Sequence, residues 1–509
     1  MKNIAVINAI NLRPPALRPL AGGGCALERA VAFGRGLPGV ADVALLVSQS
    51  FPGSTENVAG ARAILREKWS VADLLDTLAE LGEGRDDTFY FFGDCPLLDA
   101  ELAARMHGNH RRYFADYTFA DGFPYGLAPE ILRAGTARRL RALAGDGPDA
   151  RMPPDRETVF TVLKKDINSF DVETELSPVD LRMLRAVLAA DSERNFLLLS
   201  RITQGGGRDA QSACRLLQES PAMLRTLPAY FPIQIAEGCP QSCAYCPYPL
   251  VGGDPTKRQG FMPAESFVAL LGGIEGFVGD AVIGISLWGE PSLHPDIFSL
   301  ISETLSRPSL DLVIETSGIG WDQALFQKVR SSLPRMPTWI VSLDASQQAV
   351  YRALRGEGFA EALRTAEALL ELFPGSAWVQ AVRMKENEED LEAFFKGWKS
   401  RTENHGASSA VIIQKYDSFC GLLPDRTVAD LSPVKRFPCW HLMRDLPILL
   451  DGTVPLCREE LKAERSLGNA LAEELAVIWE RGAEVHRSHL RKEYPGPCAR
   501  CDEYYTYNF

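Results

Sequence analysis

The chain has 509 residues, of which 46% are hydrophobic and 24% are charged, a balance typical of globular proteins. This length predicts several domains, since a single core stops growing beyond about 250–300 residues. The net charge of −12 argues against a nucleic-acid or anionic-membrane partner, because both require a basic surface. No apolar run reaches the ~20 residues of a membrane span, and the chain opens without a signal peptide. We therefore expect a cytoplasmic protein, and its eleven cysteines indicate metal ligation and not disulfides.

Residues 1–225 alternate strand-like and helical stretches, which predicts an α/β domain of Rossmann type with a mostly parallel sheet. Asp94 follows the apolar stretch FYFFG, so its carboxylate is expected at the carboxyl end of a strand, where open α/β sheets bind ligands. A carboxylate there suits Mg²⁺, which prefers oxygen ligands. The alternative interpretation of Asp94 is a turn residue without a function.

This part of the chain resembles the cytidylyltransferase-like nucleotidyltransferases that activate sugars, in the segments GDCPLLDAEL, DGFPYGLAPEIL and FDVETELSPVDLRML. In that family, the aspartate matching Asp94 binds metal and a later acidic segment, here beginning at Asp171, supplies a second ligand. The resemblance therefore implies Mg²⁺ at these two residues. The phosphate-binding loop of the family is replaced here by Arg13-Pro14-Pro15, and prolines offer no N–H to a phosphate. We expect the fold to be retained and nucleotidyl transfer to be weak.

Three cysteines fall within eight residues of one loop, Cys239, Cys243 and Cys246. An apolar run over residues 231–236 precedes them and Gly238 breaks it, which places the loop at the carboxyl end of a strand. Three thiolates can hold three irons of a four-iron–four-sulfur cluster and leave the fourth iron open for a small molecule. A zinc site is the alternative, but zinc requires a fourth Cys or His nearby and none occurs in the next forty residues.

The cysteine loop resembles the signature of the radical S-adenosylmethionine (SAM) enzymes. In those enzymes the open iron binds SAM, and one electron from the cluster cleaves SAM to a 5′-deoxyadenosyl radical. Strand-like and helical stretches alternate after the loop, which predicts a partial (β/α)6 barrel over residues 226–430. The strands after the first are expected over residues 281–291, 310–320, 338–346, 376–387 and 409–417.

Polar residues follow these apolar runs repeatedly, which places them on the same rim as the cysteine loop. The segment containing Gly289 and Glu290 is similar to the Gly-Gly-Glu segment that binds the SAM amino group in the family. Taken alone, Glu290 or Asp344 is also explained as a helix cap or a turn residue. The resemblance implies that SAM is bound by Tyr245, Gly289, Glu290, Thr316, Ser317, Ser342, Asp344 and Arg383.

Residues 431–509 contain four more cysteines, Cys439, Cys457, Cys498 and Cys501, which are enough to coordinate a second cluster. The segment resembles the SPASM domain of radical SAM enzymes, in the shortened Twitch form that carries one auxiliary 4Fe–4S cluster. Four thiolates also make a closed structural zinc site, and the spacing does not separate the two.

The resemblances together divide the chain into a nucleotidyltransferase-like domain (1–225), a radical SAM core (226–430) and a SPASM/Twitch-like domain (431–509), as in the spiro-SPASM proteins. They imply a radical SAM oxidoreductase or modifying enzyme with a flavodoxin- or ferredoxin-like electron donor. Its substrate would be a peptide or a sugar- or nucleotide-linked small molecule. The alternatives are a nucleotidyltransferase-like sugar-nucleotide enzyme or a binding protein, either with a regulatory iron–sulfur half.

Overall fold

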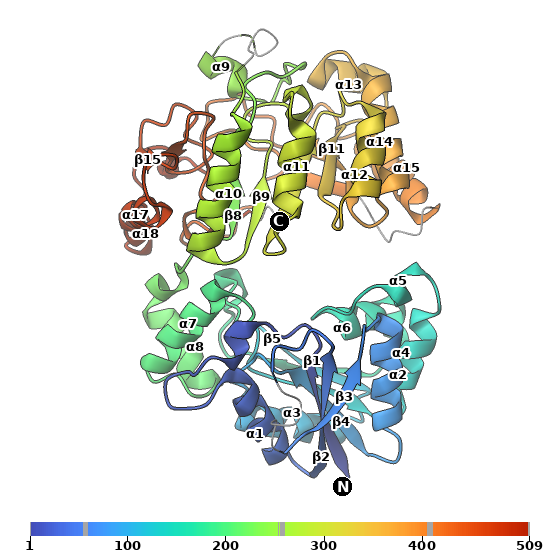
Figure 1. Cartoon of the computed structure of the whole chain (residues 1–509). Helices are drawn as coiled ribbons and strands as arrows, with labels where there is room; N and C mark the ends of the chain where they lie inside the picture. Colours follow the sequence, from blue (N-terminus) through green and yellow to red (C-terminus); the bar gives the residue numbers. More distant parts are fainter. Residues whose placement is uncertain (1, 54–59, 253, 255–259, 405–410, 507–509) are drawn as a thin grey trace. The chain divides into compact units, whose positions relative to one another are not determined.

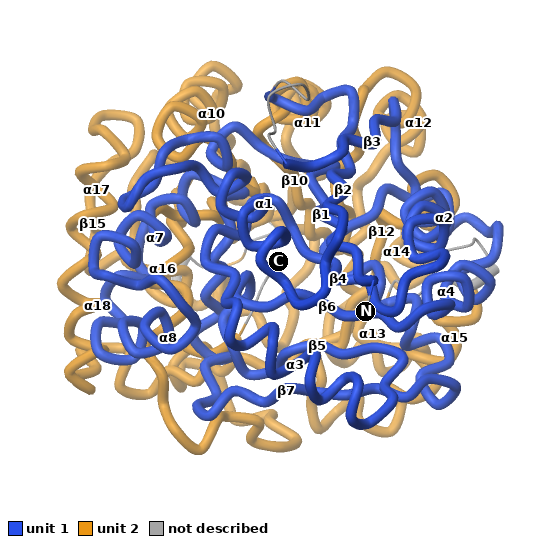
Figure 2. Tube along the Cα trace, turned by 90° about the horizontal axis from the view of Figure 1, so that it is seen from below, with its two compact units in different colours: residues 1–226 blue, residues 227–509 orange. Residues whose placement is uncertain are grey.

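The computed structural model describes residues 2–53, 60–252, 254, 260–404 and 411–506. The chain divides into two compact units, Met1–Thr226 and Leu227–Phe509, which Figure 2 draws in separate colours. Each unit has its own sheet and its own hydrophobic core. No helix within the described ranges combines the length and the apolar character that a membrane span requires.

Unit 1 is built on seven strands: β1 (Asn3–Ala9), β2 (Val40–Ser48), β3 (Arg62–Arg66), β4 (Asp87–Phe92), β5 (Tyr117–Asp121), β6 (Glu130–Arg133) and β7 (Val172–Leu176). They form one sheet in the order β3-β2-β1-β4-β6-β5-β7. Strand β6 runs antiparallel to both of its neighbours, whereas the other pairs are parallel. The sheet is therefore mostly parallel, as the alternating pattern predicts.

Helices cover both faces of this sheet: α1 (Ala26–Gly36), α2 (Val71–Leu81), α3 (Ala100–Arg112), α4 (Thr136–Ala144), α5 (Pro148–Arg151), α6 (Thr158–Leu163), α7 (Glu193–Gln204) and α8 (Ala210–Glu219). Successive residues of β1 enter different cores because side chains alternate across a strand. Ile7 packs in the core that includes residues of α1 and α3, and Val6 packs in the core of α2 and α4. Both faces of β1 are thus buried, which explains its continuous apolar run.

Unit 2 contains six parallel strands that follow one another in chain order across the sheet. They are β8 (Tyr230–Pro232), β9 (Ala281–Gly284), β10 (Leu310–Thr316), β11 (Thr338–Ser342), β12 (Ala377–Arg383) and β13 (Val411–Lys415). This parallel half-barrel confirms the predicted partial barrel. Residues 409–410 of the last predicted strand lie outside the described residues.

The helices between these strands are α10 (Ala264–Val278), α11 (Ile297–Leu305), α12 (Gln323–Ser332), α13 (Gln348–Arg355), α14 (Phe359–Leu372) and α15 (Leu391–Asn404), and a short helix, α9 (Tyr248–Gly252), follows the cysteine loop. Figure 1 shows α10, α11, α12 and α14 along the outer face of the strands. Their apolar residues share one core with the sheet. The parts of the strands that these helices do not cover border a cavity.

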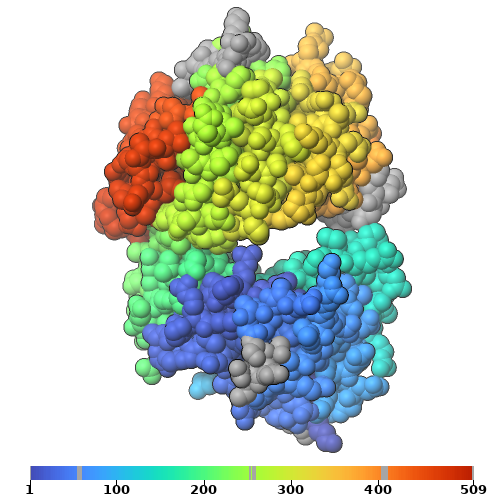
Figure 3. Space-filling model, viewed as in Figure 1, coloured from blue at the N-terminus to red at the C-terminus, as the bar shows by residue number. Residues whose placement is uncertain are grey.

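The C-terminal part of unit 2 contains α16 (His441–Arg444), β14 (Thr453–Pro455), β15 (Ser466–Asn469), α17 (Leu475–Arg481) and α18 (Ala483–Leu490). Its segment 444–448 lies along the free edge of β8, where the N–H of Ile448 donates to the carbonyl of Pro232 (2.9 Å). Helix α17 packs on α10, and Figure 3 shows this red segment directly against the green one. The tail therefore covers a sheet edge that would otherwise expose unpaired backbone groups.

We expect Trp339→Ala to destabilise unit 2 by about 3–5 kcal/mol, because a large cavity would remain in its core. Trp339 is fully buried and packs edge-on against Trp321 and Phe326, at ring-centroid distances of 5.3 and 5.4 Å. Urea unfolding followed by circular dichroism measures the change. The control Val477→Ala, at an exposed position of α17, should stay within about 0.5 kcal/mol. Equal unfolding midpoints for the two variants would contradict this account of the core.

Candidate functional site

Unit 2 encloses a cavity of about 1050 Å³, lined by residues of β8, β10, β11, β12 and β13 and by the segment that follows β9. The cysteine loop between β8 and α9 opens into the same cavity. The structure therefore brings together most of the predicted site, namely Cys239, Cys243, Cys246, Tyr245, Gly289, Glu290, Thr316, Ser317 and Ser342. Sequence reasoning did not assign several other lining residues: Trp288, Glu315, Arg355, Lys415, Asp417, Arg458 and Glu503.

The three thiols of the loop are free and only partly exposed. Burial raises the pKa of Cys239 to about 12, with a further contribution from Glu290, and burial raises the pKa of Cys246 to about 11. Buried thiols need a nearby positive charge to ionise, and a bound metal supplies it. Three soft thiolate donors converging on one cavity fit an iron–sulfur cluster with one open iron.

Glu290 is buried and holds two neighbouring strand ends together. Its carboxylate accepts hydrogen bonds from the Thr316 hydroxyl (2.6 Å) and from the Ser317 N–H (2.8 Å). Burial raises the pKa of Glu290, and these hydrogen bonds oppose the rise. The carboxylate is thus largely occupied within the protein, and it shapes the wall of the cavity.

Gly289 is required by a close approach of two backbone segments. A Cβ atom at this position would lie 2.0 Å from the carbonyl oxygen of Ala236, in the segment that leads to the cysteine loop. The preceding Trp288 has a φ of 51°, which is uncommon for a residue with a side chain. The backbone here is held against the cysteine loop, and the Trp288 ring stacks on Tyr248 with 6.1 Å between centroids.

Asp344 is completely buried and is not one of the residues that line the cavity. It accepts hydrogen bonds from the Tyr245 hydroxyl (2.5 Å), the Arg355 guanidinium (2.6 Å) and the Val382 N–H (2.7 Å). Arg355 in turn donates to Gln241 of the cysteine loop (2.9 Å). Asp344 therefore positions Tyr245 and the loop from behind.

Arg383 also lies outside the lining of the cavity. Its guanidinium pairs with Glu388 at 2.5 Å, and the pair is about 39% exposed. On the same strand, Gln380 does line the cavity and donates to the Ser342 hydroxyl (3.4 Å).

A second, smaller chamber in unit 2 is lined by the four tail cysteines, Cys439, Cys457, Cys498 and Cys501. A fifth cysteine, Cys420, lines the same chamber, although sequence reasoning left it unassigned. The only sequence signal was its position shortly after the last barrel strand. The pKa of Cys457 is raised well above its usual value, first by burial and then by Glu459. Like the loop thiols, the Cys457 thiol requires a metal to ionise.

His489 supplies an independent indication of what the chamber holds. Its Nδ1 accepts from the Cys439 N–H (3.4 Å), so the proton of the neutral ring lies on Nε2. Burial and the charge of Arg436 lower the pKa of His489 to about 4, which keeps the ring neutral at pH 7. Nε2 is buried without a hydrogen-bond partner among the described residues. An unpaired donor beside five thiols fits a group rich in sulfur acceptors, such as an iron–sulfur cluster.

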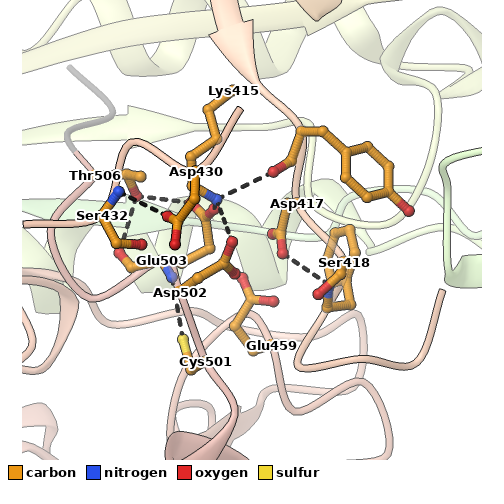
Figure 4. Close-up of polar contacts among 12 residues, drawn as sticks. Lys415, Asp417, Ser418, Asp430, Ser432, Glu459, Cys501, Asp502, Glu503 and Thr506 are labelled. Carbon is orange, nitrogen blue, oxygen red and sulfur yellow. Dashed lines mark hydrogen bonds and ion pairs between the residues drawn. The ribbon is translucent and has the colours of Figure 1, made fainter. Parts of the chain in front are cut away.

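An ion-pair network contains residues that line the chamber and residues that line the barrel cavity. Figure 4 shows its contacts around Lys415. The Lys415 amine pairs with Asp502 (2.8 Å) and with Glu503, the two residues that follow Cys501. Arg458, which follows Cys457, lies 3.5 Å from Asp417 and 3.6 Å from Glu503. Arg458 and Glu503 line both cavities.

Among the described residues, the acidic side chains close enough to share a metal ion are Asp417, Asp502 and Glu503. Lys415 and Arg458 already neutralise much of the negative charge of this group. Burial, and then the charge of Glu503, raise the pKa of Asp417 to about 6, against the effect of Arg458. The network consequently forms a charged wall of the cavity, in which the Asp417 carboxyl has a pKa of about 6.

The predicted Mg²⁺ site of unit 1 is not assembled. Asp94 is buried and paired with Arg156 at 2.5 Å. Asp94 follows the carboxyl end of β4, whereas Asp171 precedes the amino end of β7, and the sheet register makes these two strands parallel. The two carboxylates therefore lie at opposite edges of the sheet, so they do not share a metal ion.

Family models match two parts of the chain. The Radical SAM superfamily model matches residues 233–396, and the SPASM model, an iron–sulfur cluster-binding domain, matches residues 439–502. The protein is thus an enzyme of SAM-dependent radical chemistry that uses a 4Fe–4S cluster, SAM and an auxiliary cluster. The match to the SPASM model supports the expected iron–sulfur cluster in the tail, and not zinc.

The chain belongs to the same family as an uncharacterized protein of Treponema pallidum (strain Nichols). The two are 40% identical over 364 residues, which span 69% of this chain and 98% of the relative. A second uncharacterized protein of that strain is 30% identical over 137 residues, 24% of this chain and 63% of the relative.

Several solved structures are also similar, including the following two. SuiB of Streptococcus suis bound to precursor peptide SuiA has a TM-score of 0.42 and 14% identity, covering 53% of this chain and 69% of that chain. A cytidylyltransferase from Leptospira borgpetersenii serovar Hardjo-bovis (strain JB197) has a TM-score of 0.36 and 15% identity, covering 44% and 95%.

We expect Lys415→Met to loosen the segment that carries Cys498 and Cys501. Removing one partner of a buried ion pair costs about 3–5 kcal/mol, because the remaining charge is left uncompensated. Lys415 is 14% exposed, and its partner Glu503 is 6% exposed. Hydrogen exchange followed by mass spectrometry should show peptides over residues 498–506 exchanging at least about tenfold faster.

The matched control for this experiment is Lys385→Met. Lys385 pairs with Asp425 at 3.3 Å on the surface, where an ion pair contributes about 0–1 kcal/mol. Its exchange profile over residues 498–506 should equal that of the unchanged protein. Identical profiles for both variants would show that the Lys415 network does not hold the tail.

Proposed function

We propose that this protein is a radical SAM oxidoreductase that abstracts a hydrogen atom from an organic substrate and completes a net two-electron oxidation. The observation that carries the proposal is the lining of the barrel cavity. It extends from the three loop cysteines to Arg458 and Glu503, which also line the chamber of the tail cysteines. A substrate in this cavity would lie between the two cysteine sites. A two-electron oxidation that uses both clusters requires this position.

Cys239, Cys243 and Cys246 are proposed to hold the first cluster, which when bound supplies the electron that cleaves SAM to the 5′-deoxyadenosyl radical. Ser342 faces the cavity and accepts from Gln380, so its own proton can be donated to SAM. Tyr245 contributes an aromatic wall that Asp344 holds in place. Glu290, Thr316 and Ser317 bond to one another, and we assign them to shaping the SAM pocket next to Gly289. Direct contacts of Asp344 and Arg383 with SAM remain predictions.

Cys439, Cys457, Cys498 and Cys501 are proposed to hold the auxiliary cluster, which when bound accepts an electron. Arg458 and Glu503 line both this chamber and the barrel cavity. Asp417 lines the barrel cavity and its pKa is raised to about 6, so it can take up a substrate proton at its carboxylate. The proposed substrate is a peptide or a sugar- or nucleotide-linked small molecule, and the electron donor is a cytoplasmic flavodoxin- or ferredoxin-like protein.

For unit 1 we propose a nucleotidyltransferase-like fold that binds a ligand without transferring a nucleotide, as in the spiro-SPASM arrangement. The mostly parallel sheet supports the fold. The loss of catalysis is supported by the Asp94–Arg156 pair and by the prolines after β1, which begin a short 3-10 helix (Pro14–Leu17). Arg18 is also occupied, because it pairs with Glu193 at 2.5 Å.

Replacing Cys239, Cys243 and Cys246 together with alanine should abolish formation of 5′-deoxyadenosine from SAM under dithionite. It should also remove about four irons per chain, because only one cluster is lost. Anaerobic reconstitution, iron analysis and chromatography of the products measure both effects. The matched control Cys214→Ala changes a cysteine of unit 1 and should cleave SAM normally. SAM cleavage by the triple variant would refute the assignment of the loop.

Replacing Cys498 and Cys501 together with alanine should spare SAM cleavage and lower the iron content by about four per chain. The first cluster keeps its own three ligands, so its spectroscopic signal should be unchanged. Metal analysis of the unchanged, anaerobically purified protein provides the reference and should show about eight irons without stoichiometric zinc. One zinc per chain with about four irons would instead make the tail a structural site.

A further inference from the structure

The auxiliary chamber contains one cysteine more than a cluster with four irons requires. Five thiols line it, and four of them belong to the segment that the SPASM domain covers, residues 439–502. Cys420 precedes that segment and reaches the chamber from the loop after β13. We propose that Cys420 and Cys501 share one iron position of the auxiliary cluster, so that either thiolate completes its coordination. This inference rests on the proposed function of the tail cysteines.

The pairing of these two cysteines is specific. Of the chamber thiols, Cys420 and Cys501 hydrogen-bond to each other through their sulfurs. Two cysteine sulfurs in contact are two candidates for one ligand position, since an iron binds a deprotonated sulfur.

The chain directs Cys420 into the chamber through an unusual backbone. Phe419 and Cys420 have φ values of 50° and 57°, in the left-handed region that residues with side chains seldom adopt. The turn is held by Asp417, which accepts from the Phe419 N–H (2.7 Å), and by Ser418, which accepts from the Gly421 N–H (3.1 Å). The resulting position of Cys420 is buried, with 6% of its surface exposed.

The same turn borders both cavities of unit 2. Asp417 and Phe419 line the barrel cavity, and Cys420, the next residue, lines the auxiliary chamber. Phe419 also packs against Trp288, beside the cysteine loop, with 5.5 Å between ring centroids. A ligand that displaces Phe419 would therefore move Cys420 relative to Cys501. The turn thus connects the shared iron position to the barrel cavity, where the proposed substrate binds.

The exchange requires no oxidant or reductant. When the cluster is bound, either Cys501 or Cys420 would supply the thiolate that completes it, and the other cysteine would remain a protonated thiol. Exchange between the two would pass one proton along their hydrogen bond. The numbers of electrons, protons and thiolate ligands are unchanged. His489, which lines the chamber with an unpaired Nε2 among the described residues, can hydrogen-bond to the sulfur acceptors in either state.

The proposal is tested by iron and acid-labile sulfide content of the anaerobically reconstituted full chain and its variants. The variants are Cys420→Ala, Cys501→Ala, the corresponding double variant and Cys439→Ala. Each of the first two should keep about eight irons per chain, whereas the double variant should keep about four. Cys439→Ala, which has no substitute, should also keep about four. The electron paramagnetic resonance signal of the auxiliary cluster should shift between the two single variants, since the ligand set differs.

Loss of the auxiliary cluster from Cys501→Ala, to the same extent as from Cys439→Ala, would overturn the shared position. Retention of eight irons by the double variant would overturn it as well, because neither thiol would then be a ligand. Circular dichroism and the intact signal of the first cluster distinguish cluster loss from misfolding. About four irons in the unchanged protein would instead contradict the auxiliary cluster itself, and the shared position with it.

Discussion

The ion pairs of Lys415 with Asp502 and Glu503 are the contact on which the functional unit depends. Lys415 ends the last strand of the half-barrel, and the two acids directly follow Cys501. Because Lys415 and Glu503 are mostly buried, neither charge is stable without the other. Arg458 extends the network from the neighbourhood of Cys457. Charge neutralisation therefore fixes both cysteine segments of the tail against the barrel cavity.

A second set of buried polar contacts prepares the opposite wall of the cavity. Glu290 joins the ends of two strands, and Asp344 orients Arg355 and Tyr245 behind the cysteine loop. These groups lie at the carboxyl ends of parallel strands, where the polar ends of several elements meet. Their hydrogen bonds are made within the protein, so the cavity is shaped before a ligand enters. The thiols are the groups that still need a charge, and the clusters provide it.

The sequence predicted the half-barrel and the class of chemistry because both are local properties. Apolar runs of strand length alternating with helical stretches determine a parallel sheet, and three cysteines in one loop determine a shared position for their sulfurs. The placement of Arg383 could not be predicted, because its partner Glu388 depends on the conformation of the loop after β12. The Mg²⁺ prediction at Asp94 and Asp171 was wrong because sequence order does not reveal which edge of a sheet a residue reaches.

By itself the sequence determined the cysteine spacing, the strand ends that carry polar residues, and hence a radical SAM protein with an auxiliary cluster. Only the tertiary structure decided which distant residues meet. It brought Cys420 into the chamber of the tail cysteines, and it placed Arg458 and Glu503 on the boundary between two cavities. It also paired Asp94 with Arg156 in an ion pair. These outcomes depend on register, edge pairing and charge neutralisation between segments far apart in the chain, and no local pattern encodes them.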